Sequence, residues 1–254
     1  MSDTTLDDAG RPAYRPDTPW GPYAALTVTV LVCLAPVLVG IAWVVAENSG
    51  LIAVDGAGWR SRGPSLASPS LLAQMIIGQL LSLAILWLAA GWKNARARTL
   101  RLLPPQTDVL TALGLGLLLI VLIGPIEILL YRLADLDLFT DGRWLLEGLR
   151  SPHWWAVAFA AVVLAPLWEE LTFRGFLLSA LAKTRLGYWP AAVISSLLWT
   201  FLHWGYSWPG LASVFLAGIG LSWIMKRTGA MSAVVIAHGA INAFSLTIVY
   251  HFAP

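Results

Sequence analysis

Residues 168–175 read Trp168-Glu169-Glu170-Leu171-Thr172-Phe173-Arg174-Gly175, and three of these side chains are ionisable. They interrupt an apolar run from Trp154 to about Ala182, which is longer than a straight membrane-crossing helix needs. A charged side chain at bilayer depth costs at least about 2.5–3.5 kcal/mol, so such residues are functional candidates by default. We therefore interpret the rest of the chain as a membrane scaffold around this cluster.

The composition is typical of a polytopic membrane protein. Of the 254 residues, 58% are hydrophobic and 12% are charged, against about 45–50% and about 25% in soluble domains. The net charge of +2 gives no reason to expect a nucleic-acid partner. The single cysteine, Cys33, allows no disulfide framework. Residues 1–20 are polar and lack the pattern of a signal peptide, so we expect a short cytoplasmic tail and the lipid bilayer as a partner.

The predicted fold is an all-α, polytopic transmembrane helical bundle of about seven spans. A spanning helix needs about 20 mostly apolar residues, and the expected helices cover residues 23–46, 71–92, 108–131, 154–182, 188–206, 211–225 and 230–250. Trp208-Pro209-Gly210 is predicted to form a tight turn. The charged segment 132–153 is expected between spans; as a re-entrant eighth piece, it would move the C-terminus to the other side. We expect N-terminal helices in 21–153 and a catalytic core in 154–254.

Lysine and arginine in the short loops predict the orientation, because cytoplasmic loops are enriched in both. With the N-terminus inside, ten such residues are cytoplasmic, namely Arg11, Arg15, Lys93, Arg96, Arg98, Arg101, Lys183, Arg185, Lys226 and Arg227. Five are outside, namely Arg60, Arg62, Arg132, Arg143 and Arg150. We expect a multi-pass protein of a bacterial plasma membrane with a cytoplasmic N-terminus. Glycines 114, 116, 218 and 220 are predicted to be close-packing positions between helices.

Most polar residues inside the predicted spans fall after residue 165. Glu170 and Arg174 are four residues apart, so they share a helix face and can form an ion pair. Glu169 points about 100° away from Glu170. His238 and Asn242 are also four apart on a later helix. His203 is predicted on the helix 188–206, where Trp199 lies one turn earlier.

These residue types suit attack by water on a peptide bond without a covalent intermediate. Glu169 is predicted to be the general base and His203 its partner on the water. His238 and Asn242 are predicted to donate hydrogen bonds to the developing oxyanion. Arg174 would neutralise Glu170, so that the two glutamates can differ. Each feature has a structural alternative, because a buried ion pair can be structural and a single intramembrane histidine can bridge helices.

Other intramembrane chemistries fit less well. The sequence contains no His-Glu-x-x-His zinc motif and no mid-span aspartate for an aspartyl dyad. Two glutamates and two histidines could hold zinc, but Arg174 beside them would oppose cation binding, so no metal or other cofactor is expected. Glu127, after Pro125 near the end of the third helix, fits either a function or a hydrogen bond to a neighbouring helix.

The three spaced motifs resemble those of the CPBP family of CAAX endopeptidases, bacteriocin-processing and bacteriocin-immunity proteins. The first, Glu-Glu-x-x-x-Arg, is Glu169 to Arg174; the second, Phe-x-x-x-His, is Trp199 to His203 with tryptophan for phenylalanine; the third, His-x-x-x-Asn, is His238 to Asn242. The resemblance covers about residues 155–245. It implies a glutamate-dependent intramembrane endopeptidase with Glu169 and His203 activating water, and His238 and Asn242 binding the oxyanion.

Two other functions remain as alternatives to an endopeptidase acting on a peptide or protein substrate at the membrane. A non-catalytic membrane scaffold or bacteriocin-immunity partner could keep the same residues for stability. A proton-coupled transporter could use Glu127 and the glutamate pair, although no inverted repeat is visible. Whichever function holds, His203 and His238 are predicted at different depths, about 22 and about 12 Å from the inner ends of their helices at about 1.5 Å per residue. Helix tilt or shifted boundaries must bring them level.

Overall fold

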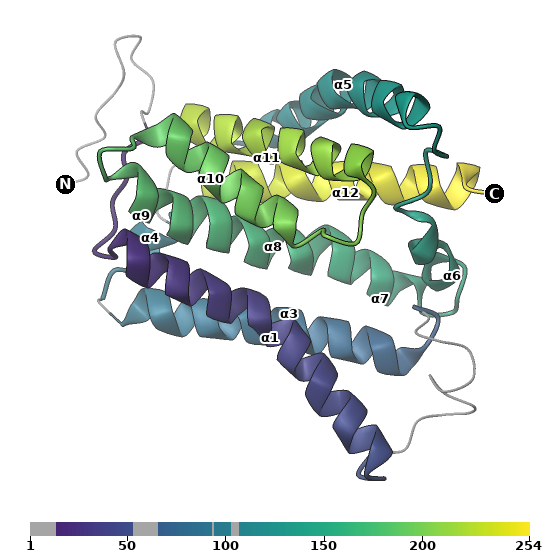
Figure 1. Ribbon diagram of the computed structural model, residues 1–254. Helices are drawn as coiled ribbons and strands as arrows, with labels where there is room; N and C mark the ends of the chain where they lie inside the picture. The colour runs from purple at the N-terminus through teal and green to yellow at the C-terminus, as the bar shows by residue number, and fades with distance from the viewer. Residues whose placement is uncertain (1–13, 53–65, 93, 103–106) are drawn as a thin grey trace.

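The computed structural model describes residues 14–52, 66–92, 94–102 and 107–254 (Figure 1). Within these ranges the chain forms helices, turns and bends but no strand, which confirms the predicted all-α fold. The helical segments are α1 (Pro22–Asn48), α3 (Pro69–Gly91), α4 (Arg96–Thr99), α5 (Val109–Leu133), η1 (Arg143–Leu145), α6 (Leu146–Leu149), α7 (Trp154–Phe159), η2 (Ala160–Leu164), α8 (Ala165–Glu170), η3 (Leu171–Leu177), α9 (Leu178–Ala182), α10 (Tyr188–Phe201), α11 (Trp208–Thr228) and α12 (Met231–Phe252).

Six helices among the described residues are long and apolar enough to cross a membrane, close to the seven predicted. They are α1, α3, α5, the continuous run Trp154–Ala182, α11 and α12. The predicted span that is missing from these six, 188–206, corresponds to α10, whose 14 residues cover only about 21 Å at 1.5 Å per residue. Between α5 and α7, the described chain contains only η1 and α6, of three and four residues, so no re-entrant eighth span forms there.

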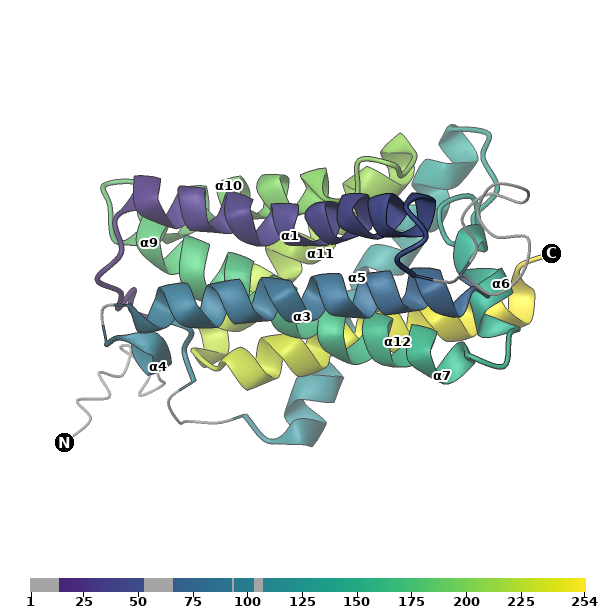
Figure 2. The same ribbon diagram turned by 90° about the horizontal axis from the view of Figure 1, so that it is seen from below.

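The run Trp154–Ala182, which comprises α7, η2, α8, η3 and α9, is the centre of the bundle. Of its most apolar stretch, 61% of the residues are buried inside the protein, against 17% for α1 and for α5. Figure 1 shows it crossing the middle of the molecule, with α1 and α3 on one side and α11, α12 and α5 on the other. Figure 2 shows α1 and α3 side by side along the nearer face. The predicted cluster therefore lies on the most shielded helix.

The central helix departs from regular α geometry in two places. Segments η2 and η3 are π-helical, a geometry that is rare and frequently found at functional sites. The second π segment, η3, begins directly after Glu170 and includes Arg174, so the first motif straddles a change of helix type. Every residue of η3 is buried. The apolar run shows no break at either π segment, so the prediction was one continuous helix without these departures.

Glycines allow α12 to approach its two neighbours closely. A Cβ at Gly116 of α5 would lie 2.9 Å from the Ala237 carbonyl oxygen. A Cβ at Gly239 of α12 would lie 2.8 Å from the Val162 carbonyl oxygen in η2. Distances below about 3.0 Å require something to move, so α12 is fixed between α5 and η2. This contact places His238, the neighbour of both Ala237 and Gly239, against the central helix.

Three of the four predicted close-packing glycines are confirmed and one is wrong. Added Cβ atoms would lie 2.9 Å from a neighbouring helix at Gly116, 3.0 Å from Ser196 at Gly218, and 2.7 Å from Leu119 at Gly220. At Gly114 a Cβ would meet nothing within 4 Å. Gly114 is exposed on α5, because residues two apart on a helix point to opposite sides and only Gly116 faces α12.

The predicted tight turn at Trp208-Pro209-Gly210 is wrong, because these residues form the first turn of α11. The Ser207 hydroxyl accepts a hydrogen bond from the Gly210 N–H at 3.4 Å. Proline is tolerated in the first helical turn, where its missing N–H is not needed. At the other end, Gly229 adopts a left-handed conformation with φ of 65° and ends the helix.

One end of the bundle collects basic side chains from separate connections. Arg101 donates to the carbonyl oxygens of Gly229 at 3.3 Å and Arg15 at 2.7 Å, and Lys183 donates to the Thr18 carbonyl oxygen at 2.9 Å. These contacts join three connections that were predicted to be cytoplasmic; which side of a membrane they face remains a prediction. Most of the predicted tail 1–20, Lys93 and the arginines at 60 and 62 lie outside the described residues.

Candidate active site

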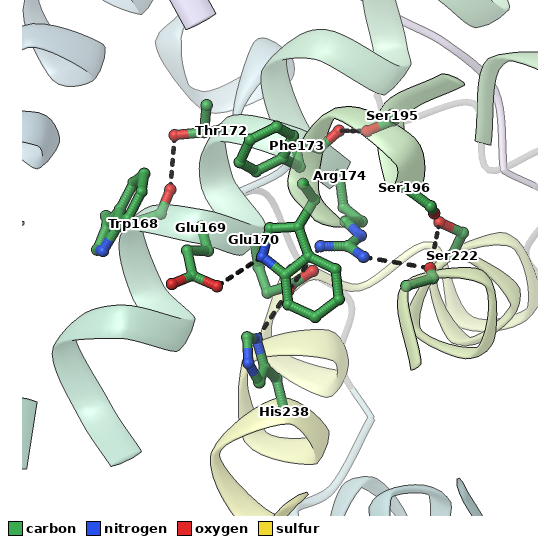
Figure 3. Close-up of polar contacts among 12 residues, drawn as sticks. Trp168, Glu169, Glu170, Thr172, Phe173, Arg174, Ser195, Ser196, Ser222 and His238 are labelled. Atoms are coloured by element: carbon green, nitrogen blue, oxygen red, sulfur yellow. Dashed lines mark hydrogen bonds and ion pairs between the residues drawn. The ribbon is translucent and has the colours of Figure 1, made fainter. Parts of the chain in front are cut away.

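Glu170, Arg174 and His238 form a buried, directly bonded trio. The Arg174 Nη1 atom donates to Glu170 Oε1 at 2.9 Å, and both side chains are fully buried. His238 Nδ1 lies 2.8 Å from the same Glu170 oxygen, although His238 comes from α12. Figure 3 shows the three side chains converging from the central helix and α12. The predicted ion pair therefore also bridges two helices, which was not foreseen.

Arg174 has further partners that hold its guanidinium in place. Its Nη2 atom donates to the Gly218 carbonyl oxygen on α11 at 3.2 Å. Its guanidinium carbon lies 4.4 Å from the centroid of the Trp199 ring on α10, which is within the range of a cation–π interaction. A buried guanidinium is costly unless its donors are satisfied. Here the Glu170 carboxylate, the Gly218 carbonyl oxygen and the Trp199 ring meet the guanidinium, whereas the buried Nε has no hydrogen-bond partner among the described residues.

Glu169 has a different environment from its neighbour Glu170. Its Oε2 atom accepts a hydrogen bond from the indole Nε1 of Trp199 at 2.6 Å. The side chain is 8% exposed, whereas Glu170 is 0% exposed. Among the described residues, no ion pair involves Glu169. The two adjacent carboxylates are thus bound by different groups, a neutral indole and a charged guanidinium.

His203 lies beyond the end of α10, which corrects the predicted helix 188–206. The helix ends at Phe201, and tighter bonds follow from Leu202 N–H to the Trp199 carbonyl oxygen at 3.0 Å and from His203 N–H to Thr200 at 2.9 Å. The His203 Nδ1 atom lies 3.3 Å from the Trp199 carbonyl oxygen. A carbonyl oxygen only accepts, so Nδ1 carries the proton and a neutral ring leaves Nε2 as an acceptor.

Both imidazoles meet the same indole, which resolves the predicted mismatch in depth. The ring centroids of His203 and Trp199 are 5.3 Å apart, and those of His238 and Trp199 are 5.4 Å apart, both edge to face. His203 is half-buried, and His238 is buried at 4% exposure. Trp199 also bonds to Glu169. It therefore contacts Glu169 and His203, which were predicted to activate water, and His238, which was predicted to bind the oxyanion.

Asn242 lies one turn after His238 on α12 and faces the first π segment. Its Nδ2 atom donates to the carbonyl oxygen of Ala161 in η2 at 2.8 Å. An amide nitrogen has two hydrogens, so one remains after this bond. None of the described hydrogen bonds joins Asn242 directly to the two glutamates or the two histidines. Its place on the oxyanion therefore stays a prediction.

The structure contains an anchor for the His203 turn that the sequence analysis missed. Asp141 accepts hydrogen bonds from the Ser207 N–H at 2.8 Å, from the Ser207 hydroxyl at 2.6 Å and from the Tyr131 hydroxyl. These bonds tie the segment after α5 to the start of α11. In the sequence, this segment stood out only as a charged stretch between two apolar runs. It holds in place the turn that carries His203 and Tyr206.

Tyr206 completes this side of the site, and its ring centroid lies 5.3 Å from that of His203. Burial raises the pKa of Tyr206 to about 12, and the carboxylates of Asp141, Glu169 and Glu127 add to the effect. Tyr206 is therefore a neutral phenol at physiological pH. The half-buried Glu127 is close enough to act on Tyr206 electrostatically, but no described hydrogen bond or ion pair joins it to the cluster.

Metal binding has no ready ligand set in the part of the chain that the structure describes. No group of three or more histidine, cysteine, aspartate or glutamate side chains there could hold a metal ion. Glu170 and His238 are bonded to each other, and the Arg174 charge lies beside them.

The fold and the site define a polytopic helical membrane protein with glutamate, histidine and arginine gathered inside its helices. Residues 151–244 match the family described as type II CAAX prenyl endopeptidase Rce1-like. A stretch of 82 residues is 28% identical to UPF0177 protein YxdF of Lactococcus lactis subsp. lactis (strain IL1403), covering 32% of this chain and 44% of that protein. No solved structure matches the chain.

These matches confirm the predicted resemblance to the CPBP family for the C-terminal part of the chain. The matched segment contains all six candidate residues, from Glu169 to Asn242.

Proposed function

We propose that this protein is an intramembrane endopeptidase that hydrolyses a peptide bond of a membrane-associated peptide or protein by activated water. The observation that carries the proposal is the meeting of Glu169, His203 and His238 around Trp199. A carboxylate and two imidazoles from three separate segments share this one indole. Residues kept only for packing or for a single ion pair would not need that convergence.

In this proposal, Glu169 is the general base and His203 orients the water. Glu169 Oε2 is engaged by the indole of Trp199, which leaves Oε1 to accept a proton. The Nδ1–H of His203 points to the Trp199 carbonyl oxygen, so Nε2 of the neutral ring can accept a hydrogen bond from the same water. Two acceptors on one water direct its oxygen lone pair towards a substrate carbonyl.

In the same proposal, His238 and Asn242 stabilise the oxyanion, and Glu170, bonded to Arg174, orients His238. A guanidinium nitrogen only donates, so Glu170 Oε1 accepts from Arg174 and can also accept the Nδ1–H of His238. His238 then donates through Nε2 only when it carries a second proton. The proposal therefore requires a doubly protonated His238 while the oxyanion exists.

The reaction can then be written with its protons balanced. Glu169 removes a proton from water while the water oxygen forms a bond to the scissile carbonyl carbon. The tetrahedral oxyanion is stabilised by hydrogen bonds from His238 and Asn242. The carbon–nitrogen bond breaks, Glu169 returns the proton to the leaving amine, and a carboxylic acid and an amine result. No covalent enzyme intermediate forms.

The test is cleavage of a peptide library by purified protein reconstituted in lipid vesicles. Glu169→Ala and His203→Ala are expected to lower cleavage by at least about 100-fold, the size of a general-base contribution. Glu47→Gln is the matched control, since Glu47 bonds to Trp43 and Ser70 on α1 and α3. Equal cleavage by the alanine variants would overturn the proposal, and full cellular function of Glu169→Gln would favour a non-catalytic scaffold. A chelator added in parallel tests whether a metal is involved.

A further inference from the structure

Trp199 contacts four of the six candidate catalytic residues. Its indole donates to Glu169 Oε2 at 2.6 Å. Its ring lies 4.4 Å from the Arg174 guanidinium carbon and 5.3 and 5.4 Å from the ring centroids of His203 and His238. Its carbonyl oxygen lies 3.3 Å from His203 Nδ1. The residue is buried, at 3% exposure.

These contacts separate into two kinds, and only one kind depends on tryptophan. Any aromatic ring at this position could lie under the guanidinium and beside both imidazoles, and any residue supplies the backbone carbonyl. The hydrogen bond to Glu169 needs the indole N–H, which is a donor only. Phenylalanine, the residue expected from the resemblance, would keep the ring contacts and lose this bond.

Glu169 needs such a donor because of its neighbours. The Arg174 guanidinium lies within electrostatic range of both Glu169 and Glu170, and it is bonded to Glu170. A glutamate side chain has three rotatable torsions, so an unheld Glu169 carboxylate could turn towards the guanidinium and compete with Glu170. The indole bond fixes one oxygen, and Figure 3 shows the other oxygen of Glu169 pointing away from that bond.

We propose that Trp199 is a positioning residue whose indole N–H orients the Glu169 carboxylate and keeps it apart from the Glu170–Arg174 pair. This inference rests on the proposed endopeptidase function. Trp199→Phe removes the donor and keeps a ring. It is expected to lower kcat by about 10- to 100-fold, the cost of a misplaced catalytic group, with KM nearly unchanged. Trp204→Phe is the matched control, since Trp204 is 73% exposed.

A spectroscopic measurement tests the bond without relying on activity. In protein labelled with ¹⁵N-tryptophan, the indole signal that disappears in Trp199→Phe identifies Trp199 among the fourteen tryptophans. That signal is expected to move upfield in Glu169→Ala, because the hydrogen bond is lost, and to stay in place in Glu47→Gln. A role limited to packing would lower the unfolding midpoint in Trp199→Phe and would not couple the indole signal to Glu169.

The outcomes separate this inference from the function on which it rests. If the wild type cleaves the substrate and Trp199→Phe has the same kcat, the positioning role is overturned. The proposed endopeptidase function is then unaffected. If the Trp199 indole signal keeps its position in Glu169→Ala, the positioning role is overturned, whatever the activity. Wild-type protein that cleaves nothing argues against the endopeptidase, and the indole signal then decides alone whether Trp199 holds Glu169.

Discussion

Replacing Arg174 by methionine tests how much the buried trio contributes to stability. The change removes the guanidinium and keeps a long apolar side chain, so the buried Glu170 loses Arg174 and keeps only its bond to His238. Both members of the pair are fully buried, with 2.9 Å between Arg174 Nη1 and Glu170 Oε1. Removing one partner of a buried ion pair costs about 3–5 kcal/mol, because the remaining charge is uncompensated. We expect Arg174→Met to lower the free energy of unfolding by that amount.

The double variant Glu170→Gln with Arg174→Met separates the pair from general packing. Glutamine is neutral and can still bond to His238, so the double variant buries no unpaired charge at this position. Its destabilisation is expected to be smaller than the sum of the two single changes, with a coupling energy towards the upper end of the usual range of about 0.5–3 kcal/mol. The exposed pair Arg98–Asp17, 3.5 Å apart with side chains 51% and 57% exposed, is the control; its coupling is expected at about 0–1 kcal/mol.

The chain provides its own reporter for this measurement. Cys33 on α1 is the single cysteine and is half-buried, so a dye that fluoresces on reaction with thiols reports unfolding of the bundle. None of the substitutions adds a cysteine. A coupling energy for Glu170 and Arg174 no larger than that of the exposed pair would refute the reasoning, because the buried charges would then be independent of each other.

Two further predictions concern helix packing and pH. Gly239→Ala is expected to destabilise by about 1–3 kcal/mol, because its Cβ would lie 2.8 Å from the Val162 carbonyl oxygen, whereas Gly114→Ala, which meets nothing within 4 Å, should leave the Cys33 unfolding midpoint unchanged or slightly higher. Hydrogen bonds from the Thr111 hydroxyl and N–H hold the pKa of Asp108 below its ordinary value, so its stabilising effect is present above pH of about 4 and is lost as pH falls through the lowered value. Asp108→Asn keeps a capping oxygen and should show a smaller loss of stability on acidification; an equally large loss would contradict this role.

The long apolar helices could be predicted from the sequence because bilayer thickness sets their length. The predicted ranges 23–46, 71–92 and 108–131 agree within about two residues with Pro22–Asn48, Pro69–Gly91 and Val109–Leu133. The end of α10 could not be predicted in this way. Leu202 and Trp204 continue the apolar pattern past the end of the helix at Phe201. The turn that follows is anchored through Ser207 by Asp141, which is distant in sequence. Hydropathy contains no information about that contact.

The candidate residues could be chosen by type and spacing, but their pairing could not. Spacing indicated that Glu170 and Arg174 share a face, and the structure contains that bond. The bond from His238 to Glu170 depends on how α12 packs against the central helix, which is set by Gly116 and Gly239. The π geometry of η3 also has no mark in the sequence, because π and α segments have the same apolar composition.

The difference between two adjacent glutamates is the feature on which the proposed chemistry depends. Successive residues on a helix point about 100° apart, so Glu169 and Glu170 inevitably face different neighbours. Glu170 meets Arg174 and His238, two groups that donate to the same oxygen. Glu169 meets a neutral indole N–H, which orients its carboxylate without compensating the charge. The residue with no ionic partner among those described is therefore the one free to exchange a proton with water. If the indole N–H faced Glu170, and the guanidinium and imidazole faced Glu169, Glu170 would become the general base in this mechanism.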